Sequence, residues 1–149
     1  MNTTGRGVDA PLLDSYLNPH HFERKTMPAV ATPTILERAQ SLQSYIQSGR
    51  ILEAMTEFYA EGCAMQENAA APCLGLAANI EREKKFLSMV KEWKGYVVKA
   101  LAVGENVSIV ESTMDFVNTE GKAVHMEQVS VQRWKNGKIV HERFYYNAA

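Results

Sequence analysis

Residues 122–146, KAVHMEQVSVQRWKNGKIVHERFYY, decide the fold class. Asn136 and Gly137 near the centre of this stretch both accept positive φ, so they permit the two-residue turn of a β-hairpin. Apolar and polar side chains alternate on both sides of the turn, which is typical of β-strands. The stretch therefore predicts two antiparallel strands, at residues 122–134 and 138–146.

The segments before this hairpin complete the sheet and add helices. Residues 96–103 and 107–117 have the same two-residue period and are separated by turn residues, so the strands form a meander. Residues 34–49, 51–62 and 76–93 carry apolar side chains at three- and four-residue steps, which predicts three amphipathic helices. Helices followed by a strand meander predict an α+β fold: a cone-shaped, curved antiparallel sheet with three helices packed over its concave face.

The composition limits the number of domains and the classes of partner. With 149 residues, 46% of them apolar and 22% charged, the chain has room for one globular domain. We assign residues 33–149 to this domain. Residues 1–32 form an N-terminal arm that is either disordered or lies across a partner subunit. The net charge of −1 does not favour nucleic-acid binding, no apolar run is long enough for a membrane helix, and the N-terminus does not resemble a secretion signal.

Cysteine usage and short motifs give no indication of a cofactor. Cys63 and Cys73 fit no metal-ligand spacing, and we interpret both as reduced thiols of a cytoplasmic protein. The sequence has no glycine-rich phosphate loop and no catalytic Ser-His-Asp order. We therefore expect neither a cofactor nor a metal ion.

The hairpin turn also predicts which side chains share a face of the sheet. A two-residue turn sets Lys135 opposite Lys138, and counting outward then pairs Glu142 with Val131. The more apolar face is expected to lie under the helices and line a pocket; its members are Val110, Ser112, Met114, Phe116, Glu127, Val129, Val131, Glu142, Phe144 and Tyr146. The opposite, outer face is polar and aromatic, which suits a homodimer interface. Its members include Gln128, Ser130, Gln132, Trp134 and Tyr145.

Two carboxylates on the apolar face, Glu127 and Glu142, indicate a site. Burying an ionised carboxylate without a partner is strongly unfavourable, so each must be paired, protonated or next to water in a cavity. They can act as acid, base or orienting groups. The alternative is a purely structural hydrogen-bonded pair with Tyr146, Arg133 or Arg82.

The order of these elements resembles the nuclear transport factor 2-like superfamily and, within it, the SnoaL-like, polyketide cyclase-like group. The FYAEG sequence at residues 58–62 and the GKIV sequence at residues 137–140 carry the resemblance, which covers residues 34 to about 147. It implies a nuclear transport factor 2-like/cystatin-like roll with an apolar pocket between sheet and helices, and commonly a homodimer formed through the sheets. The superfamily includes isomerases, cyclases, dehydratases and hydrolases, and also proteins that only bind or only scaffold.

The resemblance implies roles for particular residues. The general base of catalytic members matches Glu67, eight residues after Tyr59, and a second carboxylate matches Glu142. Glu67 can also be a strand-end carboxylate that faces water. Tyr59 and Tyr146 can donate hydrogen bonds to a substrate oxygen, although tyrosines in such positions are commonly core residues. The chain has Asn147 where polyketide cyclases and hydrolases tend to have an acid, so their chemistry does not transfer directly.

We therefore expect a protein that binds an apolar small molecule, with two alternatives for its function. In the first, a cofactor-free isomerase, cyclase or dehydratase uses a pocket carboxylate as general base on an apolar carbonyl substrate. In the second, the same fold serves as a non-catalytic ligand-binding or assembly module. The candidate catalytic residues are Glu67, Glu142 and Tyr146. The candidate ligand contacts are Tyr59, Met65, Phe86, Val110, Ser112, Met114, Glu127, Val129 and Phe144.

Overall fold

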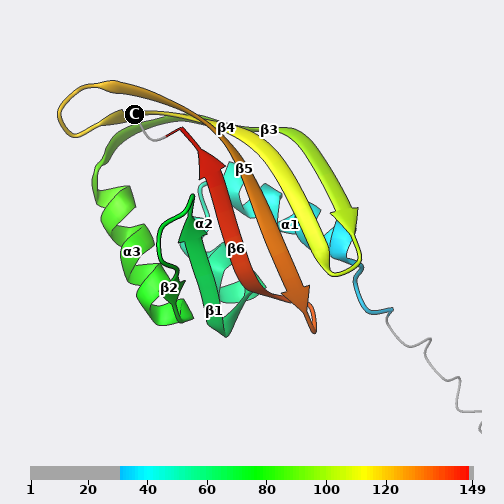
Figure 1. Cartoon of the computed structure of the whole chain (residues 1–149). Helices are drawn as coiled ribbons and strands as arrows, with labels where there is room; N and C mark the ends of the chain where they lie inside the picture. Colours follow the sequence, from blue (N-terminus) through cyan, green and yellow to red (C-terminus); the bar gives the residue numbers. More distant parts are fainter. Residues whose placement is uncertain (1–30, 148–149) are drawn as a thin grey trace, which may run out of the picture. The chain divides into compact units, whose positions relative to one another are not determined.

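A computed structural model of the protein describes residues 31–147, and Figure 1 shows its helices and strands. The helices are α1 (Ile35–Gln47), α2 (Ile51–Phe58) and α3 (Leu76–Ser88). The strands are β1 (Tyr59–Glu67), β2 (Cys73–Leu74), β3 (Val90–Gly104), β4 (Val107–Asn118), β5 (Ala123–Lys135) and β6 (Lys138–Tyr146). The predicted α+β class, with helices packed against one sheet, is confirmed.

The strands form one sheet in the order β2-β1-β6-β5-β4-β3. The meander from β3 to β6 is antiparallel throughout, as predicted. β1 pairs with β6 in parallel, so the sheet is mixed rather than purely antiparallel, and it is open at β2 and β3. The long strands bend over the helices (Figure 1), with α1 against β3 and β4 and α3 against β1.

Helix α1 begins and ends where the sequence predicts. Thr34 caps its first turn in a capping box with Glu37, and Gly49 takes a positive φ of 76° just after its end. The helix buries Ala39 and Leu42 completely in the core. That core also contains Phe58, which contacts α1 through an edge-to-face pair with the half-buried Tyr45 ring (ring centroids 5.4 Å apart).

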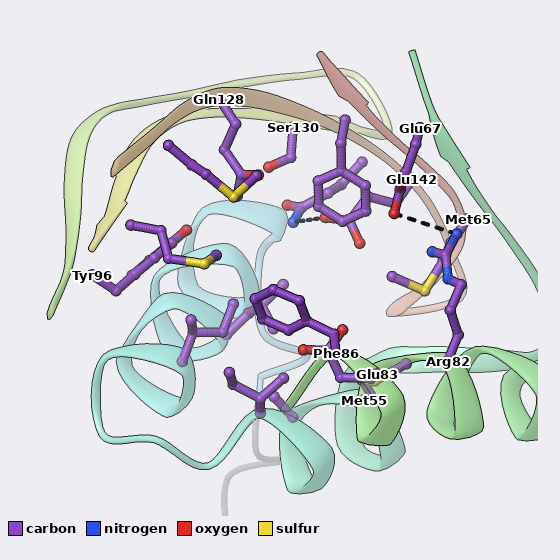
Figure 2. Close-up of a pocket in the computed structure, with 18 of the residues that line it drawn as sticks. Met55, Met65, Glu67, Arg82, Glu83, Phe86, Tyr96, Gln128, Ser130 and Glu142 are labelled. Atoms are coloured by element: carbon purple, nitrogen blue, oxygen red, sulfur yellow. Dashed lines mark hydrogen bonds and ion pairs between the residues drawn. The ribbon is translucent and has the colours of Figure 1, made fainter. Parts of the chain in front are cut away.

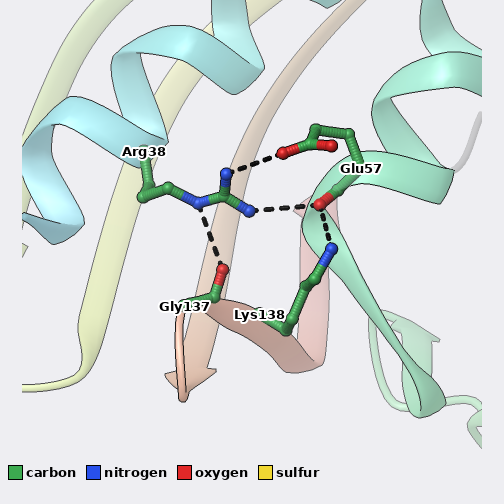
Figure 3. A network of polar contacts seen from close by, with 4 residues as sticks. All are labelled: Arg38, Glu57, Gly137 and Lys138. Carbon is green, nitrogen blue, oxygen red and sulfur yellow. Dashed lines mark hydrogen bonds and ion pairs between the residues drawn. The ribbon is translucent and has the colours of Figure 1, made fainter. Parts of the chain in front are cut away.

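Arg38 ties three elements together at one end of the domain (Figure 3). Its guanidinium donates to the Gly137 carbonyl at 3.1 Å, pairs with the Glu57 carboxylate at 2.9 Å and donates to the Glu57 carbonyl at 3.1 Å. Lys138 donates to the same carbonyl, and the guanidinium lies 4.4 Å from the centre of the Phe58 ring. The end of α2 and the β5–β6 turn are thereby fixed against α1.

Two helix ends differ from the prediction. Helix α2 ends at Phe58 rather than near residue 62, because Tyr59 already pairs with Ile139 of β6. Helix α3 ends at Ser88 rather than at residue 93, because the chain from Val90 onward pairs with β4. Trp93, which was predicted on the inner face of the helix, lies instead on β3.

A longer turn shifts the pairing of β4 with β5 by one residue. The Asn118 side-chain oxygen accepts hydrogen bonds from the backbone N–H groups of Glu120 at 3.1 Å and Lys122 at 2.8 Å. Asn commonly stabilises turns in this way. The turn that it closes is one residue longer than predicted, so Val110 pairs with Ser130 rather than with Val129.

A β-bulge shifts the pairing of β5 with β6 in the same sense. Lys135 faces Lys138 and Trp134 faces Ile139 as predicted, but Arg133 then faces His141. Val140 is therefore an extra residue in β6. Beyond this bulge Glu142 pairs with Gln132.

A shift of one residue turns every side chain of a strand to the opposite face. Glu127 and Val129 lie on the outer face of β5 and do not line the cavity, so the prediction that they share the inner face with Glu142 is wrong. The side chains of β5 that face the helices are instead those predicted for the dimer interface, namely Gln128, Ser130, Gln132 and Trp134. Of the predicted interface, Tyr145 remains on the outer face, where 43% of it is exposed.

None of the helices among residues 31–147 has the length and apolar character needed to cross a bilayer. The predictions for the N-terminal arm, residues 1–32, lie almost entirely outside the described residues.

Candidate functional site

A cavity of about 500 Å³ lies between the three helices and the inner face of the sheet. Figure 2 shows Tyr96 and Arg82 at opposite sides of this cavity, and Phe86 and Met55 among the side chains of the helices that line it. The lining residues are Leu42, Gln43, Ile46, Ile51, Ala54, Met55, Tyr59, Met65, Glu67, Arg82, Glu83, Lys85, Phe86, Met89, Tyr96, Met114, Met126, Gln128, Ser130, Gln132, Glu142, Phe144 and Tyr146. The cavity combines a broad apolar surface with a small number of polar groups, which is typical of small-molecule sites.

The structure brings together most of the residues that the sequence singles out. All three candidate catalytic residues line the cavity, together with five of the candidate ligand contacts: Tyr59, Met65, Phe86, Met114 and Phe144. Val110 and Ser112 face the same way on β4 and are fully buried, but they do not line the cavity. Glu127 and Val129 lie on the other side of the sheet.

Glu142 lies in the deepest polar part of the cavity, with only 2% of the residue exposed. Each of its carboxylate oxygens accepts one hydrogen bond: Oε2 from the Tyr59 hydroxyl at 2.5 Å and Oε1 from the Gln132 amide at 2.8 Å. No cation among residues 31–147 lies within ion-pair distance of it. Glu142 is therefore a desolvated carboxylate that is held by neutral donors.

Burial raises the pKa of Glu142 to about 7, because removal from water disfavours the charged form. The hydrogen bonds from Tyr59 and Gln132 oppose this rise, since they stabilise the carboxylate. The same environment raises the pKa of Tyr59 well above its ordinary value, through burial and the adjacent Glu142 charge, so Tyr59 stays a neutral donor. Near pH 7, Glu142 can both take and return a proton.

Gln132 is itself held by two further buried side chains. Ser108 Oγ donates to Gln132 Oε1 at 2.6 Å, and the Trp134 indole donates to Ser108 Oγ at 2.8 Å. A continuous line of hydrogen bonds therefore leads from Trp134 on β5, through Ser108 on β4, to Glu142 on β6.

A second, more exposed carboxylate lies at the edge of the cavity. Glu67 accepts a hydrogen bond from the Tyr146 hydroxyl at 2.7 Å and pairs with Arg82 at 3.6 Å (Figure 2). Its side chain is 47% exposed. Glu83, next to Arg82 on α3, is half-buried, and burial raises its pKa. We call Glu67, Tyr146, Arg82 and Glu83 the edge cluster.

Polar side chains of β5 continue along the cavity wall from Gln132, on the side of β6 away from β1 and Glu67. Ser130 pairs with Phe144 and Gln128 with Tyr146, so both lie on the inner face after Gln132. Among residues 31–147, neither the Ser130 hydroxyl nor the Gln128 amide has a side-chain hydrogen bond, and both side chains line the cavity. They are available to a ligand.

Sequence reasoning missed these β5 residues as site residues because it assigned the polar side chains to the outer face. Gln43 and Tyr96, which form a hydrogen bond of 2.8 Å at another part of the wall, were missed as well. Arg82, which the sequence analysis names only as a structural partner of a carboxylate, also lines the cavity, as does Glu83. One sequence pattern could have identified the β5 residues as part of a site. Gln128, Ser130 and Gln132 are spaced two residues apart, which puts three hydrogen-bonding side chains on one face of the strand.

Within the described part of the chain, no three His, Cys, Asp or Glu side chains gather closely enough to ligate a metal ion. The side chains that line the cavity can offer proton transfer at Glu142, hydrogen-bond donation by Tyr59, Ser130 and Gln128, and apolar contact with methionines and aromatic rings.

Comparisons with known proteins agree with this geometry. The profile of the SnoaL-like domain family matches residues 30–146. A structure from Mesorhizobium loti, proposed to be a SnoaL-like polyketide cyclase, is 25% identical, with a TM-score of 0.67 over 76% of this chain and 100% of that one. AclR of Streptomyces galilaeus, a proposed hydroxylase, is 13% identical, with a TM-score of 0.65 over 76% of this chain and 91% of its own.

A further structure, TerC co-crystallised with polyporic acid, is 11% identical, with a TM-score of 0.64 over 75% of this chain and 90% of its own. These last two similarities concern the fold alone. No curated protein shows significant similarity to the chain.

Proposed function

The chain belongs to the SnoaL-like domain family, and from this premise we propose that it binds an apolar carbonyl compound and moves a proton on it without a cofactor. The reaction class is isomerisation, cyclisation or dehydration. The observation that carries the proposal is Glu142: a buried carboxylate, without an ion-pair partner among the described residues, beside a tyrosine hydroxyl in a cavity. A general acid–base works best when its pKa lies near the working pH, and that of Glu142 is about 7.

The proposed base is Glu142 rather than Glu67, which the sequence favoured. Glu67 is half-exposed and already engaged by Arg82 and Tyr146. Glu67 therefore lacks the two features that support Glu142 as the base, near-complete burial and the absence of an ion-pair partner among the described residues.

The proton balance of the step follows from the hydrogen bonds. The ionised Glu142 removes a proton from the carbon next to the substrate carbonyl, and the electron pair of the broken C–H bond moves into an enolate. The newly protonated carboxyl no longer requires both donors, so the Tyr59 hydroxyl can turn to the enolate oxygen. Glu142 then returns the proton to another carbon, or to a leaving hydroxyl that departs as water.

The cavity wall supports a ligand with oxygen atoms along one edge. Ser130 and Gln128 offer unused hydrogen-bonding groups in the row that begins at Gln132, while Met55 of α2 and Phe86 of α3 offer a flexible apolar surface from the helices. TerC, which has the same fold, was co-crystallised with polyporic acid, and this is consistent with an oxygenated organic ligand.

The test is deuterium exchange. The protein is incubated with a panel of apolar ketones in D2O, and NMR follows loss of the proton next to the carbonyl. We expect exchange with at least one ketone, reduced at least about 100-fold by Glu142→Gln and less than about threefold by Glu67→Gln. Ketones that bind without exchange would favour the alternative, a non-catalytic binding protein, and equal effects of the two substitutions would contradict the assignment of the base.

The outer face of the sheet supports a second element of the proposal, a homodimer. Its centre is apolar, with Ile109 and Val131 paired and Val129 beside Tyr145. One end of the face is acidic and the other basic. The acidic end contains Glu111, Asp115 and Glu127, next to His125, and the basic end contains Arg133, His141 and Arg143.

A second copy stacked by a two-fold axis that runs between the faces and perpendicular to the strands brings each acidic end against a basic end, because that rotation reverses the strand direction. Light scattering at micromolar concentration is expected to give the dimer mass. Ile109→Glu, which places a charge at the exposed apolar centre, is expected to give the monomer. A monomeric mass for the unaltered protein would exclude the dimer.

A further inference from the structure

We propose that Trp134 and Ser108 are positioning residues for Glu142: they orient the Gln132 amide so that its NH2 group faces the carboxylate. Neither residue lines the cavity, and Trp134 acts on Glu142 from two side chains away. The inference rests on the proposed role of Glu142 in proton transfer. Its test, however, does not require a substrate.

The direction of the line of hydrogen bonds follows from the chemistry of its first member. An indole N–H can only donate, so Ser108 Oγ must accept from Trp134, at 2.8 Å. The single proton of the Ser108 hydroxyl is then free to donate, and Gln132 Oε1 accepts it at 2.6 Å. The other end of the amide, its NH2 group, is left to donate to Glu142 at 2.8 Å. The tryptophan thus sets the polarity of the whole line.

Burial makes this polarity persistent. Ser108 is 0%, Gln132 1% and Trp134 4% exposed, so water does not compete for any of the three hydrogen bonds. A reversed amide would place Gln132 Oε1 against Glu142 Oε1, two acceptors in contact within a dry site. Such an arrangement is unfavourable for a carboxylate but suits a protonated carboxyl, which can donate.

The orientation of the Gln132 amide therefore biases Glu142 toward its ionised, proton-accepting form. The other groups near Glu142 are the Tyr59 hydroxyl and Cys63 thiol of β1, Arg82 and Glu83 of α3, and Tyr96 of β3. None of them hydrogen-bonds to Ser108 or Trp134. Among residues 31–147, the hydrogen bonds of Ser108 therefore lead to Glu142 through Gln132.

The experiment measures the titration of Glu142 directly. Protein labelled with 13C at the glutamate carboxyl carbons is titrated by NMR, and the Glu142 signal is assigned by its loss in Glu142→Gln. Ser108→Ala frees the Gln132 amide to turn, and we expect it to raise the pKa of Glu142 by about one unit. Gln132→Met, which removes the donor while keeping the volume, is expected to raise it at least as much.

Ser112→Ala is the matched control. Ser112 is also fully buried on the inner face of β4, four residues along the strand, and its hydroxyl has no hydrogen-bond partner among residues 31–147. It lies near the Tyr96 hydroxyl, which donates to Gln43 instead. We expect no change in the Glu142 titration. Equal pKa values for Glu142 in Ser108→Ala and the unaltered protein, or an equal rise in Ser112→Ala, would overturn the inference.

A measurement on the unaltered protein covers the case in which Ser108→Ala does not fold. The indole N–H signal of Trp134 should shift with pH at the same midpoint as the Glu142 carboxyl, because the line of hydrogen bonds connects them. A Trp134 signal that does not follow Glu142 would also overturn the inference. If the pKa shifts occur but Glu142→Gln leaves deuterium exchange unchanged, the proposed function fails while the positioning of Glu142 stands.

Discussion

Glu142 and Glu67 are the same kind of side chain on the wall of the same cavity, and both accept a hydrogen bond from a tyrosine, yet their surroundings differ. Glu142 is 2% exposed and is held by the neutral groups of Tyr59 and Gln132. The Glu67 side chain is 47% exposed and faces the guanidinium of Arg82 at 3.6 Å. Solvent and cation stabilise the charge on Glu67, whereas burial works against the charge on Glu142.

The roles proposed for the two carboxylates therefore rest on their surroundings and not on their places in the sequence. Two glutamates that face one cavity are suited to different tasks: Glu142 to exchanging protons, and Glu67 to holding Arg82 and Tyr146 at the edge. The predictions below test this contrast, in order of decreasing effect.

The largest expected effect is the dependence of stability on pH. The pKa of Glu142 is about 7 in the folded protein, against an ordinary value of 4.5, so the folded state binds more protons between these values. The free energy of unfolding is therefore expected to fall as pH rises from about 4.5 to 7, by up to about 3 kcal/mol. Urea unfolding followed by circular dichroism across this range measures the fall.

Glu142→Gln is expected to remove most of this fall and to be more stable than the unaltered protein at pH 8, because an uncharged amide replaces a buried charge. Glu67→Gln, the matched variant at the exposed position, is expected to leave the fall in place. If the free energy of unfolding became independent of pH in Glu67→Gln and not in Glu142→Gln, Glu67 and not Glu142 would be the source of the pH dependence.

The second effect concerns the two tyrosines that donate to these carboxylates. Tyr59→Phe removes a buried hydrogen bond to Glu142, and we expect the pKa of Glu142 to rise by about one unit and stability above pH 7 to fall by roughly 1.5–3 kcal/mol. Tyr146→Phe removes a hydrogen bond to a half-exposed partner and is expected to cost less than about 1 kcal/mol. Denaturant unfolding at pH 8 compares the two, and equal losses would mean that depth in the cavity does not matter.

The elements of the fold could be predicted from the sequence because local signals determine them. Thr34 and Gly49 delimit α1, and Asn136-Gly137 closes the last hairpin, as the structure shows. These signals depend on the conformation of a few neighbouring residues. At these positions the conformation depends little on the rest of the fold.

The faces of β5 could not be predicted because they depend on the two neighbouring hairpins. The turn at Asn118 and the bulge at Val140 each add one residue, and no periodicity in the sequence marks either addition. The prediction also assumed that the more apolar face of β5 lies under the helices. In the structure, Val129 faces outward while Gln128 and Gln132 face the cavity. Polar residues on an inner face break the usual pattern where a site requires them.

The sequence analysis placed Glu142 on the inner face by counting side chains alternately from the hairpin turn, without the bulge at Val140. The same alternation put Ile139 on the outer face, but its exposure is 0%. The bulge at Val140 lets both residues face inward. The inward position of Glu142 was therefore predicted for an incomplete reason, and the preference for Glu67 as base followed from not knowing which carboxylate was dry.

The third effect is small and tests the edge cluster. Arg82→Gln removes an exposed ion pair of 3.6 Å, and we expect the free energy of unfolding to change by less than about 0.5 kcal/mol. The pKa of Glu83, which burial raises and Arg82 lowers, is expected to rise further when the positive charge is removed. NMR titration of the Glu83 carboxyl measures the rise, and a fall would contradict this account of the edge cluster.

The smallest effect is expected from Glu127→Gln, and the residue whose titration responds tests the strand register. On the outer face, Glu127 lies 3.6 Å from the His125 ring, whose pKa is raised chiefly by Asp115 and to a lesser degree by Glu127. Removing the Glu127 charge should therefore lower the pKa of His125 slightly and leave the titration of Glu142 unchanged. NMR of the His125 ring and of the Glu142 carboxyl measures both. In the register predicted from the sequence, Glu127 would share the inner face with Glu142, and the larger response would appear at Glu142 because charges interact more strongly in a dry cavity than in solvent.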